Sequence, residues 1–185
     1  MDFGVDRVMD VVTRLLPEAG VDVVMIGGHA VNHYGVSRAT QDIDFMVAAA
    51  DEDTVRRILC AEGFTNVAVH ETVLFFNQPG TALRVDFLKV DRKTLDRLLA
   101  NAKEVEYFGG YGVRVPQLED LLAMKLFALS SGGARREDKD FSDIVNLVIE
   151  NHVPVDMELR ELCQQFADES LYARLCARIK ELQDD

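Results

Sequence analysis

The stretch "SRATQDIDFMV", residues 37–47, decides how the chain is interpreted. Asp42 and Asp44 flank Ile43 and open an apolar run, although aspartate is a poor strand former. In a β-strand, residues i and i+2 point to the same face, so the two carboxylates are expected to project together, roughly 7 Å apart at Cα. Ile43 then points into the core. Two like charges on one face repel each other unless a cation lies between them or both face solvent.

A third aspartate favours the cation. Asp86 lies inside "LRVDFLKV", residues 83–90, among apolar side chains. A carboxylate in that setting is costly to bury without a partner. If this strand lies beside residues 42–47, three carboxylates converge, and hard oxygen ligands suit Mg²⁺ or Mn²⁺ rather than zinc. Two such ions are the usual device for in-line phosphoryl or nucleotidyl transfer.

The sequence "IGGHAV", residues 26–31, adds a candidate anion site. Gly27 and Gly28 follow a short apolar strand, and glycine lets a backbone approach an anion closely. The helix expected next presents free N–H groups at its N-terminus. A Gly-Gly turn alone is weak evidence, but a turn of this kind before a D-x-D pair and a third aspartate is much stronger evidence.

Together these motifs resemble a known family. "GGHAVNHYGVSRATQDIDFMV" followed by "RVDFL" resembles the DNA polymerase β-like nucleotidyltransferase superfamily. The "SRATQDID" form is similar to small bacterial nucleotidyltransferases related to abortive-infection (AbiEii-type) toxins. A lysine followed by R-x-x-K-D-x-x-D, within residues 125–143, fits that group too. The resemblance covers residues 23–150, and it departs from the many members that have Gly-Ser at the turn.

The resemblance implies roles for the motif residues. Gly27 and Gly28 would cradle a nucleoside triphosphate, and Asp42 and Asp44 would ligate both metal ions. Asp86 would ligate the catalytic metal and help to deprotonate the acceptor. The implied cofactor is Mg²⁺ or Mn²⁺, and the implied substrate is an NTP, either ATP or another ribonucleotide. The activity would move an NMP from the NTP to an acceptor hydroxyl with release of pyrophosphate. The toxin relatives also imply a cognate antitoxin or another partner protein.

Lys125 falls on the apolar stripe of a helix expected over residues 117–129. A buried lysine is costly unless it snorkels to solvent or meets an anion. Because the resemblance points to the same residue, we predict that Lys125 contacts the triphosphate, with snorkelling as the alternative. In the next helix, an Arg136–Asp140 pair is predicted to position Lys125 or to contact the nucleotide.

Further polar residues admit two interpretations each. Arg38 and Thr40 precede the acidic pair, and Arg38 is expected to meet a phosphate or to balance the charge of Asp42. Lys139 and Asp143 are four residues apart on a helix, so an exposed ion pair explains them adequately.

Neither zinc nor disulfide bonds are expected. His29 and His33 have zinc-compatible spacing on a helix, but no cysteine or glutamate completes a ligand set at a recognisable distance. The three cysteines, Cys60, Cys163 and Cys176, are odd in number and form no C-x-x-C pair, so we predict reduced core thiols.

Charge excludes some partners. The chain has 32 acidic and 20 basic residues and a net charge of −12, whereas bulk DNA or RNA binding relies on lysine and arginine. We therefore expect no bulk nucleic acid and no anionic membrane, and an acceptor that is a small molecule, a protein side chain or a specific RNA end. No apolar run approaches the roughly 18 residues of a membrane span, and residues 1–10 do not resemble a secretory signal, so we expect a cytoplasmic protein.

The pattern of elements predicts an α+β fold. A nucleotidyltransferase core with a polymerase β palm-like mixed sheet flanked by helices is expected over residues 1–116, and a C-terminal helical part packed against it over residues 117–185. Strands are expected over residues 21–26, 42–47, 71–77, 83–90 and a hairpin over 104–116. Helices are expected over residues 5–17, 29–35, 51–64, 92–102, 117–131, 137–150 and twice within 156–185.

Two other classes of function remain open. One is a non-catalytic nucleotide-binding or toxin–antitoxin interaction module on the same fold, against which the intact Asp42, Asp44 and Asp86 weigh. The other is a hydrolase that uses the same carboxylates, which is less favoured because no histidine or glutamate base accompanies them.

Overall fold

The computed structural model describes residues 3–131 and 137–184, and the chain divides into two compact units. The first unit comprises Met1–Ala30 and Ala39–Gln117, and the second comprises Val31–Arg38 and Leu118–Asp185. Helix α3 (Gly27–His33) begins in the first unit and ends in the second. Each unit therefore contains residues from two separate parts of the sequence.

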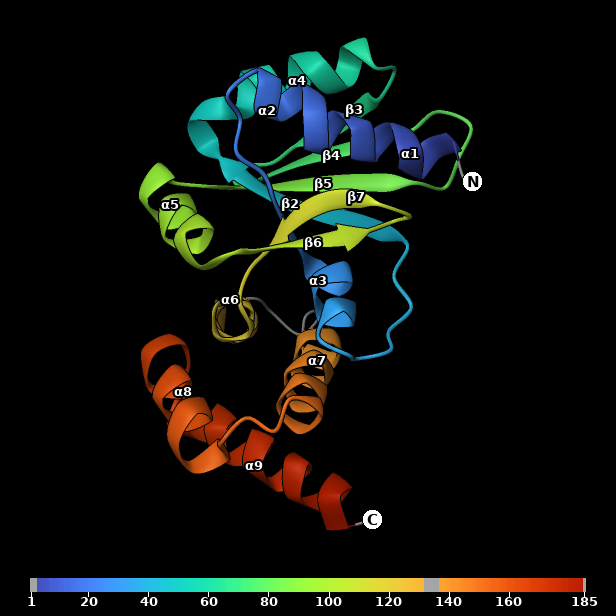
Figure 1. The fold of residues 1–185 in the computed structure, drawn as a ribbon. Coiled ribbons are helices and arrows are strands. Elements are labelled where there is room, and N and C mark those ends of the chain that lie inside the picture. Colours follow the sequence, from blue (N-terminus) through green and yellow to red (C-terminus); the bar gives the residue numbers. More distant parts are fainter. Residues whose placement is uncertain (1–2, 132–136, 185) are drawn as a thin grey trace. The chain divides into compact units, whose positions relative to one another are not determined.

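The first unit is built on a five-stranded mixed sheet with the strand order β1-β2-β5-β4-β3 (Figure 1). Strands β2 and β5 run parallel to each other, whereas the other three neighbouring pairs are antiparallel. The five strands are β1 (Val24–Ile26), β2 (Asp42–Ala48), β3 (Thr65–Val69), β4 (Val73–Asn77) and β5 (Arg84–Val90).

One face of this sheet carries the core of the first unit. Ile43, Phe45 and Val47 of β2 and Val85 and Phe87 of β5 are buried on it. They pack with apolar side chains of the N-terminal helical run and of α4, which lie over the same face (Figure 1). These segments are α1 (Phe3–Asp10), the π-helical turn η1 (Val11–Leu15), α2 (Leu16–Glu18) and α4 (Glu52–Ala61), and the 3₁₀ turn η2 (Ala49–Asp51) connects β2 to α4.

A helix and a hairpin complete the first unit. Helix α5 (Arg92–Asn101) starts at Asp91, whose side chain accepts a hydrogen bond from the backbone N–H of Thr94 at 2.9 Å, a standard N-terminal cap. Strands β6 (Lys103–Tyr107) and β7 (Tyr111–Val115) then form an antiparallel pair, and β7 contacts β1.

The second unit is helical. Helix α6 contacts α7 and α8, and α7 contacts α9. Among the described residues, no helix is both long and apolar enough to cross a membrane. The elements of this unit after α3 are α6 (Leu118–Ser131), α7 (Glu137–Glu150), the π-helical turn η3 (Val155–Leu159), α8 (Arg160–Phe166) and α9 (Glu169–Asp184).

The predicted α+β fold with a mixed sheet is confirmed, with two local differences. Helix α3 begins at Gly27, earlier than expected, because Gly27 has a φ of +65° and turns the chain directly from strand into helix. Strand β3 is absent from the sequence prediction. Its pairing with β4 shifts register between Asn66 and Ala68, and such a bulge disrupts the alternation by which strands are recognised.

The cysteines are free, as predicted, but they are not all core residues. Cys163 is buried, whereas Cys60 is exposed on α4 and Cys176 is intermediate. The prediction of a core thiol is therefore wrong for Cys60. The apolar stripe of α4 that faces the sheet consists of Val55, Ile58 and Leu59, and Cys60 lies outside it.

Candidate active site

The three predicted carboxylates lie on one face of two neighbouring parallel strands. In the pairing of β2 with β5, Asp44 is opposite Asp86, and Asp42 is opposite Arg84. Neighbouring strands are about 4.8 Å apart, and side chains at paired positions share a face. The expectation that residues 83–90 lie beside residues 42–47 is therefore confirmed. The carboxylates project from the face opposite the core, because they alternate with the buried residues of each strand.

Arg84 joins these carboxylates; it is the first residue of the "RVDFL" stretch, but no role is predicted for it from the sequence. Its Nη2 donates hydrogen bonds to Oδ2 of Asp42 at 2.6 Å and to Oδ2 of Asp86 at 3.0 Å, and its Nε donates to Oδ1 of Asp86 at 3.1 Å. The guanidinium thus binds Asp86 through two bonds and bridges to Asp42. The signal that identifies Arg84 in the sequence is its position two residues before Asp86, which places both side chains on one face.

Within residues 3–131 and 137–184, the cluster contains three carboxylates and the guanidinium of Arg84. Desolvation raises the pKa of Asp86 to about 6; Arg84 opposes this rise, and the charges of Asp44 and Asp42 add to it. Burial lowers the pKa of Arg84, but attraction to Asp86 outweighs that effect, so its pKa is raised overall. The arginine compensates only part of the negative charge, so the cluster can accept a further cation.

The donor chemistry of this cluster fits a hard divalent cation, because every donor is a carboxylate oxygen. Across residues 3–131 and 137–184, however, no three His, Cys, Asp or Glu side chains are grouped so that they could hold a metal ion as they stand. The carboxylates are arranged around the guanidinium of Arg84 instead. The ligands that Mg²⁺ or Mn²⁺ prefers are therefore present on one face, but they are gathered around an internal cation.

Gly27 lies directly against this cluster. Its φ of +65° is a conformation that favours glycine, and a Cβ atom added at Gly27 would overlap the carboxylate of Asp44. The first glycine of the turn is therefore required by the close approach of Asp44. Gly28 is the buried second residue of α3. The cradling of phosphates by Gly27 and Gly28 stays a prediction.

Two other residues support the start of β2 and the turn before it. The hydroxyl of Thr40 donates to the backbone carbonyl of Asp42 at 3.2 Å. His29 lies against the tip of the β6–β7 hairpin, where its ring meets the rings of Tyr107 and Phe108 edge-on, at centroid distances of 5.6 and 4.9 Å. The hydroxyl of Tyr107 also donates to the carbonyl of His29 at 3.3 Å. The hairpin tip is thus attached to the segment that directly follows the two glycines.

A second charged cluster lies within the helical unit. The Nζ of Lys125 donates to Oδ2 of Asp143 at 2.6 Å and to Oδ1 of Asp140 at 3.0 Å, and Nη1 of Arg38 donates to Oδ2 of Asp143 at 2.8 Å. Lys125 is 6% exposed and Asp143 is 3% exposed. Here two cations meet two carboxylates, so the charges are equal in number and paired.

Two of the alternatives offered for these residues are wrong. Asp143 is not one half of an exposed ion pair with Lys139, because Asp143 is buried and bound to Lys125 while Lys139 is exposed. Lys125 does not snorkel to solvent, because its ammonium is buried between two carboxylates. Asp140 does contact Lys125, whereas Arg136 lies outside the described residues.

Arg38 is held at both its backbone and its side chain. The side-chain amide of Asn32 accepts from the backbone N–H of Arg38 at 3.1 Å and donates to its carbonyl at 3.0 Å. The guanidinium binds Asp143. Pairing with Asp42, one of the two roles expected of Arg38, belongs to Arg84. A phosphate contact by Arg38 stays a prediction.

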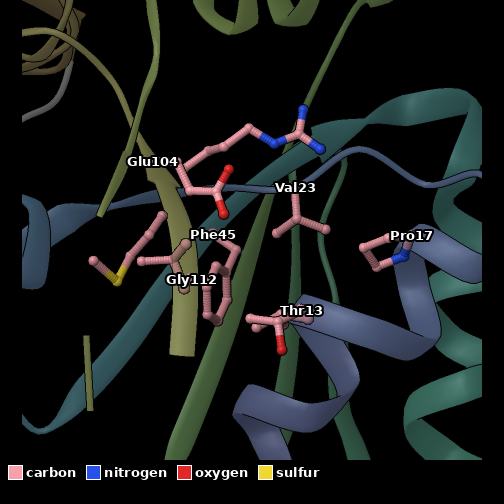
Figure 2. A pocket seen from close by; sticks show the side chains of 10 residues that line it. Thr13, Pro17, Val23, Phe45, Glu104 and Gly112 are labelled. Atoms are coloured by element: carbon pink, nitrogen blue, oxygen red, sulfur yellow. The ribbon is translucent and has the colours of Figure 1, made fainter. Parts of the chain in front are cut away.

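A cavity of about 180 Å³ lies on the other face of the sheet. Figure 2 shows Phe45 and Val23 beside it, with Thr13 and Pro17 from the N-terminal helical run and Glu104 from the hairpin. Phe45 follows Asp44 in β2, so its side chain points away from the carboxylates. The cavity is therefore separate from the acidic cluster. Its lining consists of Val12, Thr13, Pro17, Val23, Met25, Phe45, Glu104, Gly112, Val113 and Arg114.

Comparison with known proteins gives the family. The model described as "Nucleotidyl transferase AbiEii toxin, Type IV TA system" matches residues 12–171, which is most of the chain. The chain belongs to this family. The resemblance read from the glycine turn, the D-x-D pair and Asp86 is thereby confirmed, and the family supports transfer of a nucleoside monophosphate as the general reaction. Among curated proteins, no match to the chain was found.

Solved structures show the same fold. The solution structure of the antibiotic-resistance factor ANT(2'')-Ia is 12% identical, with a TM-score of 0.61 over 100% of this chain and 97% of that one. An antigenic nucleotidyltransferase-like protein from Paracoccidioides brasiliensis is 23% identical, with a TM-score of 0.59 over 97% of this chain and 91% of that one. The lincosamide antibiotic adenylyltransferase LnuA is 17% identical, with a TM-score of 0.53 over 80% of this chain and 96% of that one. At these identities the likeness establishes the fold.

Proposed function

We propose that this protein is a metal-dependent nucleotidyltransferase that moves an NMP from an NTP to an acceptor hydroxyl and releases pyrophosphate. One observation carries the proposal. Asp42, Asp44 and Asp86 lie on one face of adjacent parallel strands, and one arginine compensates only part of their charge. Carboxylates gathered on one face favour a cation-binding site, because like charges repel each other unless a cation lies between them.

The proposed reaction asks for positioning and charge neutralisation rather than covalent chemistry. Asp42, Asp44 and Asp86 would hold Mg²⁺ or Mn²⁺, which would neutralise charge on the transferring phosphoryl group. Asp86 would also accept the proton of the acceptor hydroxyl. In the metal-free cluster, desolvation raises the pKa of Asp86 to about 6, and a bound divalent cation would favour its ionised form.

Gly27 and Gly28 are proposed to approach the phosphates through their backbone N–H groups. The support is that Gly27 already lies against Asp44, so the glycine backbone adjoins a proposed metal ligand. Thr40, bonded to the carbonyl of Asp42, is proposed to contact the nucleotide beside them.

Lys125, Arg38 and Asp140 are kept as proposed nucleotide-binding residues, with Arg136 on the resemblance alone. Lysine has three N–H donors, and Asp140 and Asp143 accept two from Lys125, so one remains for a phosphate oxygen. The pairs that these residues already make also favour a structural role.

The proposed partners follow from charge and family. A net charge of −12 disfavours a polynucleotide gripped along its backbone, so the proposed acceptor is a small molecule, a protein side chain or one specific RNA end. The family description as a toxin of a type IV toxin–antitoxin system supports a cognate antitoxin as partner. A non-catalytic interaction module on the same fold is the alternative to the enzyme.

The position of a radioactive label tests the reaction. The purified protein is incubated with cell lysate, Mg²⁺ and an NTP labelled either at the α- or at the γ-phosphate. We expect the α-label to enter one acceptor and the γ-label to appear only in pyrophosphate, and Asp44→Asn to remove both signals. Transfer of the γ-label to the acceptor would indicate a kinase, and no transfer of any of the four ribonucleotides would favour the non-catalytic module.

A further inference from the structure

Arg84 occupies the centre of the acidic cluster, and its surroundings are asymmetric. Its side chain is 45% exposed, whereas the side chains of its partners Asp42 and Asp86 are 29% and 10% exposed. The carboxylates therefore lie deeper than the guanidinium that binds them. An arginine that is more exposed than the carboxylates it binds can leave them without unfolding the strand that carries it.

The bonds of Arg84 use the oxygens that a metal ion would need. Both oxygens of Asp86 and Oδ2 of Asp42 accept hydrogen bonds from it. A guanidinium spreads one positive charge over a planar group, whereas a divalent cation concentrates two charges within 2.0–2.6 Å of its oxygen ligands. The two cations compete for the same carboxylates, and the divalent ion has the higher charge density.

Arg84 also has an aromatic neighbour in the position that it occupies. The carbon centre of its guanidinium lies 5.8 Å from the centroid of the Phe75 ring, on the neighbouring strand β4. An arginine near an aromatic face gains a modest cation–π attraction. Arg84 can thus move toward Phe75 and solvent without losing every favourable contact.

We propose that Arg84 is a positioning residue, an internal counter-ion that keeps Asp42, Asp44 and Asp86 assembled before metal binds and is displaced when the divalent ion arrives. The inference rests on the proposed function, because the metal site belongs to it. It explains why the carboxylates share a face and yet form no ready-made metal site among the described residues.

Direct metal binding tests the proposal without any nucleotide or activity. Calorimetric titration of Mn²⁺ at pH 8 is compared for the wild type, Arg84→Met, Arg84→Lys and the control Arg92→Met. Both methionine variants change the net charge equally, but Arg92 pairs with Asp22 and Asp96 rather than with the proposed metal ligands. Arg84→Lys keeps the positive charge but loses the bidentate hydrogen bonding to Asp86.

We expect Arg84→Met to bind Mn²⁺ about tenfold or more tightly than the wild type, the scale of one hydrogen bond between charged groups. The affinity of Arg84→Lys for Mn²⁺ should lie between those of Arg84→Met and the wild type. The affinity of Arg92→Met should stay within about twofold of the wild type. In EDTA, Arg84→Met should also melt at a lower temperature than Arg92→Met, and saturating Mn²⁺ should remove that difference, a rescue that a purely structural arginine would not show.

Other outcomes separate this inference from the proposed function. If Arg84→Met binds Mn²⁺ no more tightly than Arg92→Met, Arg84 does not compete with the metal, and the inference fails while the metal site stands. If none of the four proteins binds Mn²⁺, the metal site fails and the inference fails with it.

Discussion

The acidic cluster on the sheet and the ion network in the helical unit contain similar residues in different proportions. On β2 and β5, three carboxylates lie on one face, and two of them, Asp42 and Asp86, bind Arg84, whose side chain is 45% exposed. In the helical unit, Lys125 and Arg38 meet Asp140 and Asp143, and the lysine and Asp143 are buried. The first cluster has a net negative charge, and the second is neutral.

The difference suggests separate tests of the two clusters, one for cation binding and one for stability. A largely buried network with equal numbers of cations and carboxylates is stabilised by its own pairs, and removing one member leaves a buried charge uncompensated. A cluster in which carboxylates outnumber the bound arginine would be stabilised further by another cation. The sequence motif of the family includes residues of both clusters, so membership in the motif does not by itself assign a residue to catalysis.

The largest effect on stability is expected for Lys125→Met, which retains the side-chain stem and removes the charge. Because Asp143 is buried and would keep only Arg38, the free energy of unfolding should fall by about 3–5 kcal/mol, the range for breaking a buried ion pair. Urea denaturation measures this change. The control is Lys139→Met, one turn from Asp143 on the exposed side of α7, which should change stability by no more than about 0.5 kcal/mol.

If Lys125→Met unfolds at the same urea concentration as the wild type, the contrast between the two clusters fails, because the helical network would then contribute nothing to folding. Loss of NTP affinity in a variant of unchanged stability would move Lys125 from the structural cluster to the binding site.

An intermediate effect is expected for Gly27→Ala, which sharpens the role of the glycine beside Asp44. Alanine at a φ of +65° is strained by about 1–2 kcal/mol, and its Cβ would also overlap the Asp44 carboxylate. The control Gly80→Ala has a similar φ of +79° and nothing within 4 Å of the added Cβ, so it carries the strain alone.

We therefore expect both variants to lose stability in chemical denaturation and Gly27→Ala to lose about 1–3 kcal/mol more, the usual cost of overpacking. Equal losses would show that Asp44 moves aside freely, and the glycine would then have no special relation to the cluster.

The smallest effect is expected at a third group of charges, where Asp22 binds Arg92 at 2.7 Å and Arg114 at 3.1 Å on the surface of the first unit. Burial raises the pKa of Asp22, but the two arginines outweigh it and hold the pKa below its usual value of 3.8. The ion pairs therefore stabilise the fold fully above the usual pKa of 3.8, and this stabilisation is lost as the pH falls through the lowered pKa of the folded state.

Asp22→Asn should thus cost roughly 1 kcal/mol or less at pH 7, as exposed pairs do, and the difference from the wild type should vanish in strong acid. Melting temperatures recorded from pH 7 down to pH 2 follow this change. A difference that grows toward acid would mean that Asp22 stabilises the fold through something other than its charge.

Much of the candidate site was predictable from local periodicity. The i, i+2 rule placed Asp42 and Asp44 on one face, and the apolar neighbours of Asp86 marked it as a carboxylate in need of a partner. The same rule applies to Arg84 and Asp86, so the arginine was within reach of the sequence. The role of Arg84 was not predicted, because an arginine at the start of a strand is common on exposed surfaces and does not by itself indicate a bound carboxylate.

The partners of Lys125 could not be predicted from the sequence. Its stripe position predicted burial correctly, but its contact with Asp143 depends on how α6 packs against α7, which periodicity within one helix does not encode. Arg38 reaches Asp143 across 105 positions of sequence, held by a backbone clamp from Asn32. Strand β3 escaped prediction for a local reason, because its bulge interrupts the alternation of faces.

Calorimetric titration of Mg²⁺–NTP into Asp44→Asn tests the central claim most directly, with the fully exposed Asp53 changed to Asn as the control for net charge. The account predicts that Asp44→Asn loses metal-dependent NTP binding while its unfolding free energy in EDTA stays level or rises, because repulsion among the carboxylates is relieved. Asp53→Asn should keep the wild-type affinity. Wild-type affinity of Asp44→Asn for Mg²⁺–NTP would contradict the account, since the excess charge on β2 and β5 would then have no ligand to explain it.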